Sequence, residues 1–309
     1  MRRAGAFYLL LLAAALVVGC SGGGPLEEAM DASVDAGSRP EAVAAATPVA
    51  EDQPESTVGV ASSDATEEGS GAARPFGYEP RAEGGSGFEA DTLLAVRHGS
   101  HGGFERVVLD LGAGEEPAAV VPRWTLDSPQ GDCLLRVNLP SANATAVSDG
   151  GIGDGLLRSF HVVRAPEGGM FVDVLARRGF RYRVLELKEP ARLVVDLRPA
   201  GAGPKEPPPA RGGETVLVEP RPGARVSDPL TVSGYSRNFE ASNTIVLKNG
   251  KGETLVRETV IANDWSSTWG YFEATLDLPP LQEKGTLSVG TGSARDGSFE
   301  GVEIPVHGG

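Results

Sequence analysis

The chain has 309 residues, of which 42 are Gly and 23 are Pro, so about a fifth is Gly or Pro against a usual ~12%. With 40% hydrophobic and 6% aromatic residues, it can build one or two modest cores, which excludes a polytopic helical membrane protein. The 28 Lys and Arg against 42 Asp and Glu give a net charge of −14. Such a charge repels phosphate backbones, so we expect no general nucleic-acid binding.

The N-terminus has the pattern of a secretory signal. Arg2 and Arg3 form a basic region, and an apolar stretch covers residues 7–18. These 12 residues are too short to cross the ~30 Å hydrocarbon core as a helix. The segment therefore predicts a signal peptide over residues 1–19.

The end of this stretch, Val17-Val18-Gly19-Cys20, resembles the bacterial lipobox. The resemblance implies cleavage between Gly19 and Cys20 and attachment of lipid to Cys20. A single acyl chain binds a membrane only weakly, and two or more are needed for stable anchoring. The two or three acyl chains of a lipidated cysteine are therefore sufficient. We expect a protein anchored to the cell membrane and facing the extracytoplasmic side, at the cell surface or in the periplasm; an ordinary secretory peptide is the alternative.

Residues 20–87 have the composition of a disordered tether. From Ser21 to Gly87 there are 13 acidic and 3 basic residues and almost no large apolar ones. Such a segment cannot bury enough apolar surface to offset its ordering entropy. We therefore expect a lipidated cysteine followed by a disordered acidic linker.

Residues 88–199 have an all-β rhythm, with short apolar runs separated by Gly, Pro, Asn and Asp. The expected strands are 92–98, 106–111, 133–139, 156–164, 170–176, 181–187 and 192–197. Two of these strands are similar, because Arg106 and Asp110 in one have the same spacing as Arg192 and Asp196 in the other. Residues four apart in a strand share a face, so a sheet face partly open to water explains the pattern without a ligand.

Two phrases in this region resemble the AMIN-like domain of bacterial envelope proteins. Residues 101–108 match its "H-x-G-F-[DE]-R-V-V" phrase, and residues 190–196 match "P-x-R-L-V-V-D". The resemblance implies a non-catalytic β-sandwich that localises its protein to the cell wall or periplasm. The matching positions, expected to be structural, are His101, Phe104, Arg106, Asp110, Arg192 and Asp196.

A Pro-rich linker is expected over residues 200–213, and a second β-sandwich over residues 214–309. Its expected strands are 216–219, 230–235, 244–249, 254–261, 269–277, 285–291 and 301–306. Seven strands in this length fit an immunoglobulin-like sandwich. The predicted fold is therefore all-β, with two β-sandwich domains after the signal peptide and tether.

The second sandwich resembles the immunoglobulin-like domain of bacterial spore germination proteins. Its phrases, in order, are residues 220–234, 238–241, 269–272 and 293–298. The partner domain that commonly accompanies this module in germination lipoproteins is missing here. The matching positions, expected to be structural, are Phe239, Glu240, Trp269, Phe272 and Asp296.

Trp265 and Tyr271 are the candidates for a binding surface, since exposed aromatic rings stack on flat apolar faces. Trp265 stands in the polar loop 263–267, whereas Trp269 and Phe272 are expected in the core. His98 and His101 lack a third ligand at a defined spacing, so they are read as polar turn residues. Asp296 is read as a turn residue and Cys133 as a buried thiol.

No catalytic motif is present, and we expect no enzyme, cofactor or metal. The expected function is that of a membrane-anchored, non-catalytic binding or scaffold protein of the cell envelope, whose partner is peptidoglycan, another wall polymer or an envelope protein. A spore-germination component that acts through protein contacts is the first alternative. A carbohydrate-active envelope enzyme is the second.

Overall fold

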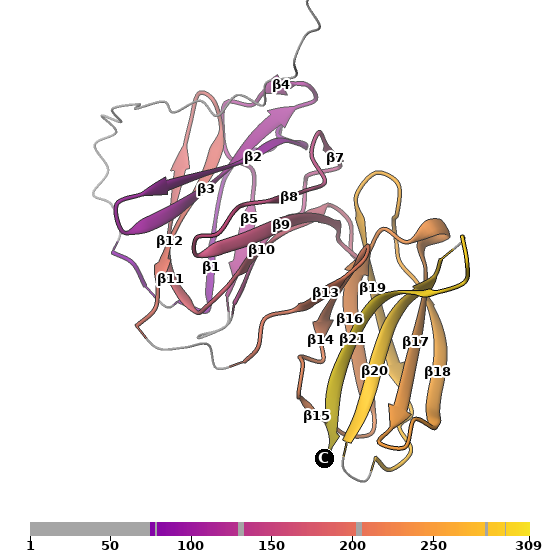
Figure 1. Ribbon diagram of the computed structural model, residues 1–309. Coiled ribbons are helices and arrows are strands. Elements are labelled where there is room, and N and C mark those ends of the chain that lie inside the picture. The colour runs from indigo at the N-terminus through magenta and orange to yellow at the C-terminus, as the bar shows by residue number, and fades with distance from the viewer. Residues whose placement is uncertain (1–74, 78, 129–132, 202–205, 282–283, 294) are drawn as a thin grey trace, which may run out of the picture. The chain divides into compact units, whose positions relative to one another are not determined.

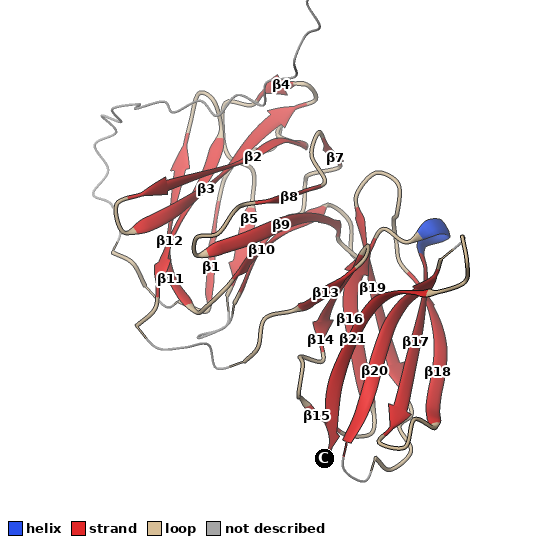
Figure 2. Ribbon diagram, in the orientation of Figure 1, coloured by secondary structure: helices blue, strands red, loops and turns tan. Residues whose placement is uncertain are grey.

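The computed structural model describes residues 75–77, 79–128, 133–201, 206–281, 284–293 and 295–309. These residues form 21 strands and a single 3₁₀ turn (Figure 2), which confirms the all-β prediction. No helix in the described part is long and apolar enough to cross a membrane. The signal peptide, Gly19, Cys20 and the tether as far as residue 74 lie outside the described residues.

The first twelve strands enclose one hydrophobic core (Figure 1). One of their sheets has the order β11-β12-β3-β2-β7, with β4 paired to β3; the facing strands run β1-β5-β6-β10-β9, with β8 paired to β9. The strands are β1 Arg81–Gly84, β2 Thr92–His101, β3 Phe104–Ala113, β4 Glu116–Pro117, β5 Trp124–Asp127, β6 Leu134–Leu139, β7 Ala144–Thr145, β8 Asp149–Gly151, β9 Leu157–Arg164, β10 Met170–Ala176, β11 Phe180–Leu187 and β12 Arg192–Pro199.

The remaining strands enclose a second core. A five-stranded sheet of order β15-β21-β20-β17-β18 faces the strands β19-β16-β14-β13. Their bounds are β13 Ala210–Gly212, β14 Thr215–Glu219, β15 Arg225–Val226, β16 Leu230–Ser236, β17 Ser242–Asn249, β18 Thr254–Ile261, β19 Trp269–Leu276, β20 Lys284–Gly292 and β21 Phe299–Gly308, with the 3₁₀ turn η1 at Phe239–Ala241.

A short parallel pairing joins strands of the two cores into one ten-stranded sheet. Trp269 and Gly270 of β19 pair with Val163 and Arg164 of β9. A third apolar cluster lies along this junction. Its buried members are Leu134, Val163, Phe171, Leu175, Val216, Val218, Tyr235 and Trp269.

Every strand expected from the sequence is present, with ends shifted by at most three residues. The tether expectation is wrong at its C-terminal end: Gly77 bridges to Tyr182, and β1 pairs with β5 within residues assigned to the linker. The linker over 200–213 likewise contains β13, which pairs with β14. Both segments are held by backbone hydrogen bonds at sheet edges, and a composition argument based on apolar side chains does not detect such bonds.

Candidate interaction surface

The turn η1 has an unusual backbone for residues other than glycine. Glu240 and Ala241 have φ angles of 54° and 58°, in the left-handed region. A buried polar network holds this turn, since Asn238 Nδ2 donates to Thr215 Oγ1 at 2.9 Å and to Asn243 Oδ1 at 2.7 Å. The turn therefore has a fixed shape, and Phe239 at its start is 68% exposed.

The loop between β18 and β19 is organised by one carboxylate. Asp264 Oδ1 accepts from the backbone N–H groups of Trp265, Ser266 and Ser267, at 2.6, 3.0 and 3.2 Å. Its Oδ2 accepts from Thr268 Oγ1 at 2.9 Å. Burial opposes ionisation of Asp264, but these hydrogen bonds outweigh it and hold the pKa of the carboxyl group below its ordinary value. The loop is thus prearranged around a charged centre.

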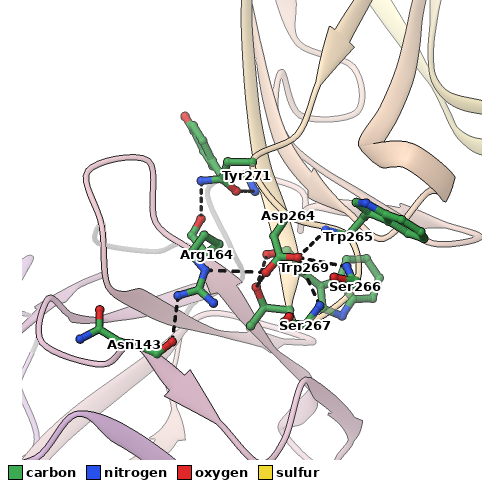
Figure 3. A network of polar contacts seen from close by, with 10 residues as sticks. Asn143, Arg164, Asp264, Trp265, Ser266, Ser267, Trp269 and Tyr271 are labelled. Atoms are coloured by element: carbon green, nitrogen blue, oxygen red, sulfur yellow. Dashed lines mark hydrogen bonds and ion pairs between the residues drawn. The ribbon is translucent and has the colours of Figure 1, made fainter.

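Arg164, at the end of β9, braces the same loop (Figure 3). Arg164 Nε lies 3.7 Å from Asp264 Oδ2, and Arg164 Nη1 donates to the backbone oxygen of Asn143 at 3.2 Å. Asn263 Nδ2 donates to the backbone oxygen of Arg164 at 3.0 Å. The loop is therefore tied to the first sandwich as well as to its own.

Trp265 extends from this network and points away from it in Figure 3. Its side chain packs edge-to-face against Phe239, with ring centroids 5.2 Å apart and planes at 74°. Trp265 is 39% exposed. Two rings from two separate loops thus form an exposed aromatic pair on a preordered backbone, which we call the aromatic pair.

The other candidate of this region, Tyr271, is only partly exposed. Its Oη donates to Glu273 Oε2 at 2.5 Å, and its ring lies 6.4 Å from that of Phe171. Burial and the hydrogen bond to Glu273 raise the pKa of Tyr271 to about 12. It therefore contributes to the junction more than to an open surface, and it does not join the aromatic pair.

Trp269 and Phe272 are both buried, but in different places. Phe272 is 1% exposed within the core of the second sandwich, whereas Trp269 is fully buried in the junction cluster. The Trp269 ring meets His161 of β9 at 4.7 Å in a T-shaped contact and Tyr235 at 5.8 Å. Trp269 thus links the two sandwiches and is not a contact residue for an external partner.

His161 is a fully buried titratable group at this junction. Burial and the nearby Arg211 and Arg158 lower its pKa to about 3, and Asp149 opposes them only in part. Within the described part of the chain, neither ring nitrogen has a hydrogen-bond partner. The junction therefore holds the neutral form of the imidazole.

In the first sandwich, most of the positions that match the two phrases at residues 101–108 and 190–196 lie on one face of a sheet. Arg106 and Asp196 form a bidentate pair, at 2.7 and 3.1 Å, and His101 stacks on Phe104 with centroids 4.8 Å apart. Asp110 accepts from Arg97, and Arg192 lies opposite Asp110 in the register. His98 and His101 belong to β2, not to the turn, and His98 Nε2 lies 3.0 Å from Glu105 Oε2.

The remaining positions have local structural roles. Ser298 donates to Asp296 Oδ1 from its backbone at 3.0 Å and from its hydroxyl at 2.6 Å, as in a turn. Cys133 is fully buried, just before β6. Among the described residues, no group of three or more His, Cys, Asp or Glu is arranged to hold a metal ion.

Sequence reasoning missed three parts of the surface: the exposure of Phe239, the organising role of Asp264 and the brace from Arg164. A signal for Asp264 was present, because the run Asn263-Asp264-Trp265-Ser266-Ser267-Thr268 is typical of loops capped by an Asx side chain. Arg164 gave no such signal, since it lies about a hundred residues earlier in the chain.

The described residues form two β-sandwiches, and the second carries the exposed aromatic pair. Residues 215–298 match the family described as the immunoglobulin-like domain of bacterial spore germination. This match contains both members of the pair and begins at the first residue of β14. Neither the curated proteins nor the solved structures contain a match to the chain.

Proposed function

We propose that this protein is a membrane-anchored, extracytoplasmic lipoprotein that acts as a non-catalytic binding and scaffold protein of the cell envelope. The lipobox-like sequence ending at Cys20 supports the anchor, and the two phrases at residues 101–108 and 190–196 support an AMIN-like first sandwich. In this proposal the second sandwich makes the contact with a protein partner.

The aromatic pair is the observation that carries the proposal. Phe239 and Trp265 come from loops whose backbones are already held, by the Asn238 network and by Asp264. Binding therefore orders few new groups, which keeps its entropic cost low. A large aromatic side chain such as Trp is also the residue type most enriched among interface hot spots.

A second candidate function is a spore-germination component that acts through protein contacts. The family match over residues 215–298 favours it. This germination role would use the same aromatic pair as the envelope-binding role. The two roles differ only in the partner that is bound and in the stage of the cell's life at which binding occurs.

The experiment that tests the proposal has two parts. Metabolic labelling with a clickable fatty acid is expected to label the full chain and not the Cys20→Ser variant; equal labelling of both would contradict the anchor. Cross-linking on whole cells, followed by mass spectrometry, is expected to capture a specific partner with the native chain and to lose it with Phe239→Ala/Trp265→Ala.

The matched control is Phe88→Ala, which removes an 89% exposed phenylalanine from the first sandwich. This control is expected to keep the partner. If the double variant retains the partner as well as Phe88→Ala does, the aromatic pair is not the contact surface.

A further inference from the structure

Strand β18 has one free edge (Figure 1). It is the last strand of the sheet β15-β21-β20-β17-β18, and among the described strands it pairs with β17 alone. Ala262, just after β18, donates its N–H to the backbone oxygen of Ala241, just before β17, at 2.9 Å. Because backbone groups alternate along a strand, those of Arg257, Thr259 and Ile261 point away from β17. β18 therefore offers a row of backbone donors and acceptors that no described strand takes up.

Strand β19 has a second free edge. Tyr271 exchanges hydrogen bonds with Asn263, on the side away from β16: its N–H donates to Asn263 Oδ1 at 2.8 Å, and its backbone oxygen accepts from the Asn263 N–H at 3.0 Å. By the same alternation, the backbone groups of Glu273 and Thr275 also point away from β16. Among the described strands, the other partner of β19 is β9, and that pairing ends at Gly270. The second half of β19 is therefore open on this side.

A groove of about 480 Å³ lies between these two strands. Val256 and Val260 of β18 and Ala274 of β19 are partly buried apolar side chains that line it. Glu258 and Asp277 line the same groove and are exposed. Within the described part of the chain, neither carboxylate forms an ion pair. The groove thus has an apolar floor and an acidic rim.

The part of β18 beside the groove has little protection against pairing. Edge strands are commonly protected by Pro, Lys or a bulge. Between Val256 and Ile261 there is no Pro and no Lys, and the register shift of β18 lies before this part, opposite Leu247 and Lys248. The protection that is present is Glu258, a charge on the groove side of the strand. A carboxylate there opposes an apolar strand and accepts a basic one.

We propose that the free edge of β18 pairs with an extended segment of a partner protein, and that this segment places lysine or arginine side chains over the groove. Their aliphatic stems would cover Val256 and Val260, and their charged ends would reach Glu258 and Asp277. Main-chain hydrogen bonds to the edge supply affinity in this mode of binding, and contacts of alternate side chains supply specificity.

The groove adjoins the aromatic pair. The loop that carries Trp265 joins β18 to β19, so the two strands that flank the groove both end at that loop. Ile261, at the end of β18, is 63% exposed. The inference names the form of the protein partner proposed for the second sandwich, and in that sense it rests on the proposed function.

Charge argues against two other occupants. A second copy of this chain would bring its own Glu258 to the groove, and each copy has a net charge of −14, so like charges oppose self-pairing. An anionic lipid surface would meet Glu258 and Asp277 at the rim of the groove and would be repelled in the same way.

The test is a titration of the purified full chain with a labelled peptide of alternating valine and lysine, blocked at both ends and as long as β18, eight residues. Fluorescence anisotropy is expected to show binding. The same peptide with N-methyl groups on alternate amides keeps its side chains and charge but cannot pair with an edge, so it is expected not to bind. Absence of binding by the first peptide, or equal binding by both, would overturn the proposal.

The matching protein variant is Thr259→Pro. It removes an N–H that points away from β17, so the hydrogen bonds between β17 and β18 are kept and the chain should fold, which circular dichroism verifies. We expect peptide binding to weaken by about tenfold or more, because an edge hydrogen bond is lost. Thr259→Ala keeps the N–H and is expected to bind as the native chain does. Equal weakening by both variants would overturn pairing through the backbone.

The charged rim is tested separately. Glu258→Gln/Asp277→Gln is expected to weaken binding of the lysine peptide. Glu115→Gln/Glu116→Gln removes the same charge from exposed positions of the first sandwich and is expected to leave binding unchanged. Equal weakening by the two double variants would reduce the effect to net charge and overturn the groove as the site.

Two further measurements separate the remaining outcomes. Self-association of the native chain in sedimentation velocity, abolished by Thr259→Pro, would overturn the proposal in favour of a second copy. If Thr259→Pro keeps the partner that is captured on whole cells while Phe239→Ala/Trp265→Ala loses it, only this inference falls and the proposed function stands. If the peptide binds but the native chain captures no partner on cells, the proposed function falls and the peptide site stands.

Discussion

Arg106 on β3 and Asp196 on β12 stand opposite each other in the antiparallel register, and Arg106 Nε donates to Asp196 Oδ1 at 2.7 Å. The two strands that carry similar phrases in the sequence are therefore hydrogen-bonded neighbours. Because they run antiparallel, an Arg-to-Asp spacing of four within each strand becomes an Arg-to-Asp pairing between them. The repeat in the sequence is thus a cross-strand charge pair in the fold.

We predict that Asp196→Asn destabilises the protein by about 3 kcal/mol, because the change leaves two guanidinium groups facing a neutral amide at a fully buried position. Urea unfolding measures the loss. Asp110→Asn is the control. Its partner Arg97 has a 54% exposed side chain, so the expected loss is below about 1 kcal/mol. Equal losses would show that burial of Asp196 has no special effect.

We predict that the free energy of unfolding decreases as the pH falls, because His161 takes up a proton more readily in the unfolded chain than in the folded one. Its pKa is about 3 in the folded chain and about 6.5 when unfolded, so the unfolded chain takes up the proton first as pH falls. The stabilisation is therefore complete above about pH 6.5 and is lost progressively as pH falls toward 3. Between about pH 6 and 5, where most carboxylates stay ionised, the expected slope is ~1.4 kcal/mol per pH unit.

Chemical denaturation at a series of pH values measures this slope. The facing charged groups Asp149, Arg158 and Arg211 are kept, and only His161 is changed. His161→Leu is expected to lower stability at neutral pH and also to flatten the slope in that window. A variant that keeps the native slope would assign the pH dependence to other groups.

We predict that Gly270→Ala disrupts the loop that carries Trp265. A Cβ atom at Gly270 would lie 1.9 Å from the backbone oxygen of Asp264 and 2.5 Å from its nitrogen, so the loop backbone must shift. The expected result is a lower melting temperature together with weaker partner capture. Gly292→Ala is the control, because its nearest neighbour is at 3.9 Å, and it is expected to change neither.

We predict that Glu240→Gly stabilises the protein by about 1 kcal/mol, since glycine adopts the left-handed backbone of this turn without steric cost. Glu258→Gly, on the exposed face of β18, is expected to destabilise by about 0.5–1 kcal/mol. Thermal unfolding distinguishes the rise in melting temperature expected for Glu240→Gly from the fall expected for Glu258→Gly. A destabilising effect at position 240 would mean that the Glu240 side chain outweighs the backbone strain.

Local patterns were sufficient to predict most strands. Alternation in β3 and β12 and the apolar runs of β9 and β10 each occur within a few residues, so period-two reasoning identified them. Short edge strands such as β1 and β13 were not predicted. Their pairing is made by backbone groups, and their side chains carry little information about it.

The candidate surface was predicted in part. The position of Trp265 in a polar loop indicated an exposed ring, and that ring is 39% exposed. Phe239 was expected to be structural, but it forms the other half of the aromatic pair. Nothing in the local sequence distinguishes an exposed from a buried phenylalanine after Asn238, since exposure depends on which loop packs beside it.

The sequence by itself determined the all-β class, the order of the main strands and the similarity of two Arg/Asp strands, because these follow from periodicity and composition along the chain. The tertiary structure alone decided that Trp269 belongs to the junction and that the free edges of β18 and β19 flank one groove. It also decided that Arg164 braces the loop of Asp264. Each of these facts joins residues from different strands, and strand order and register are set by packing over the whole domain.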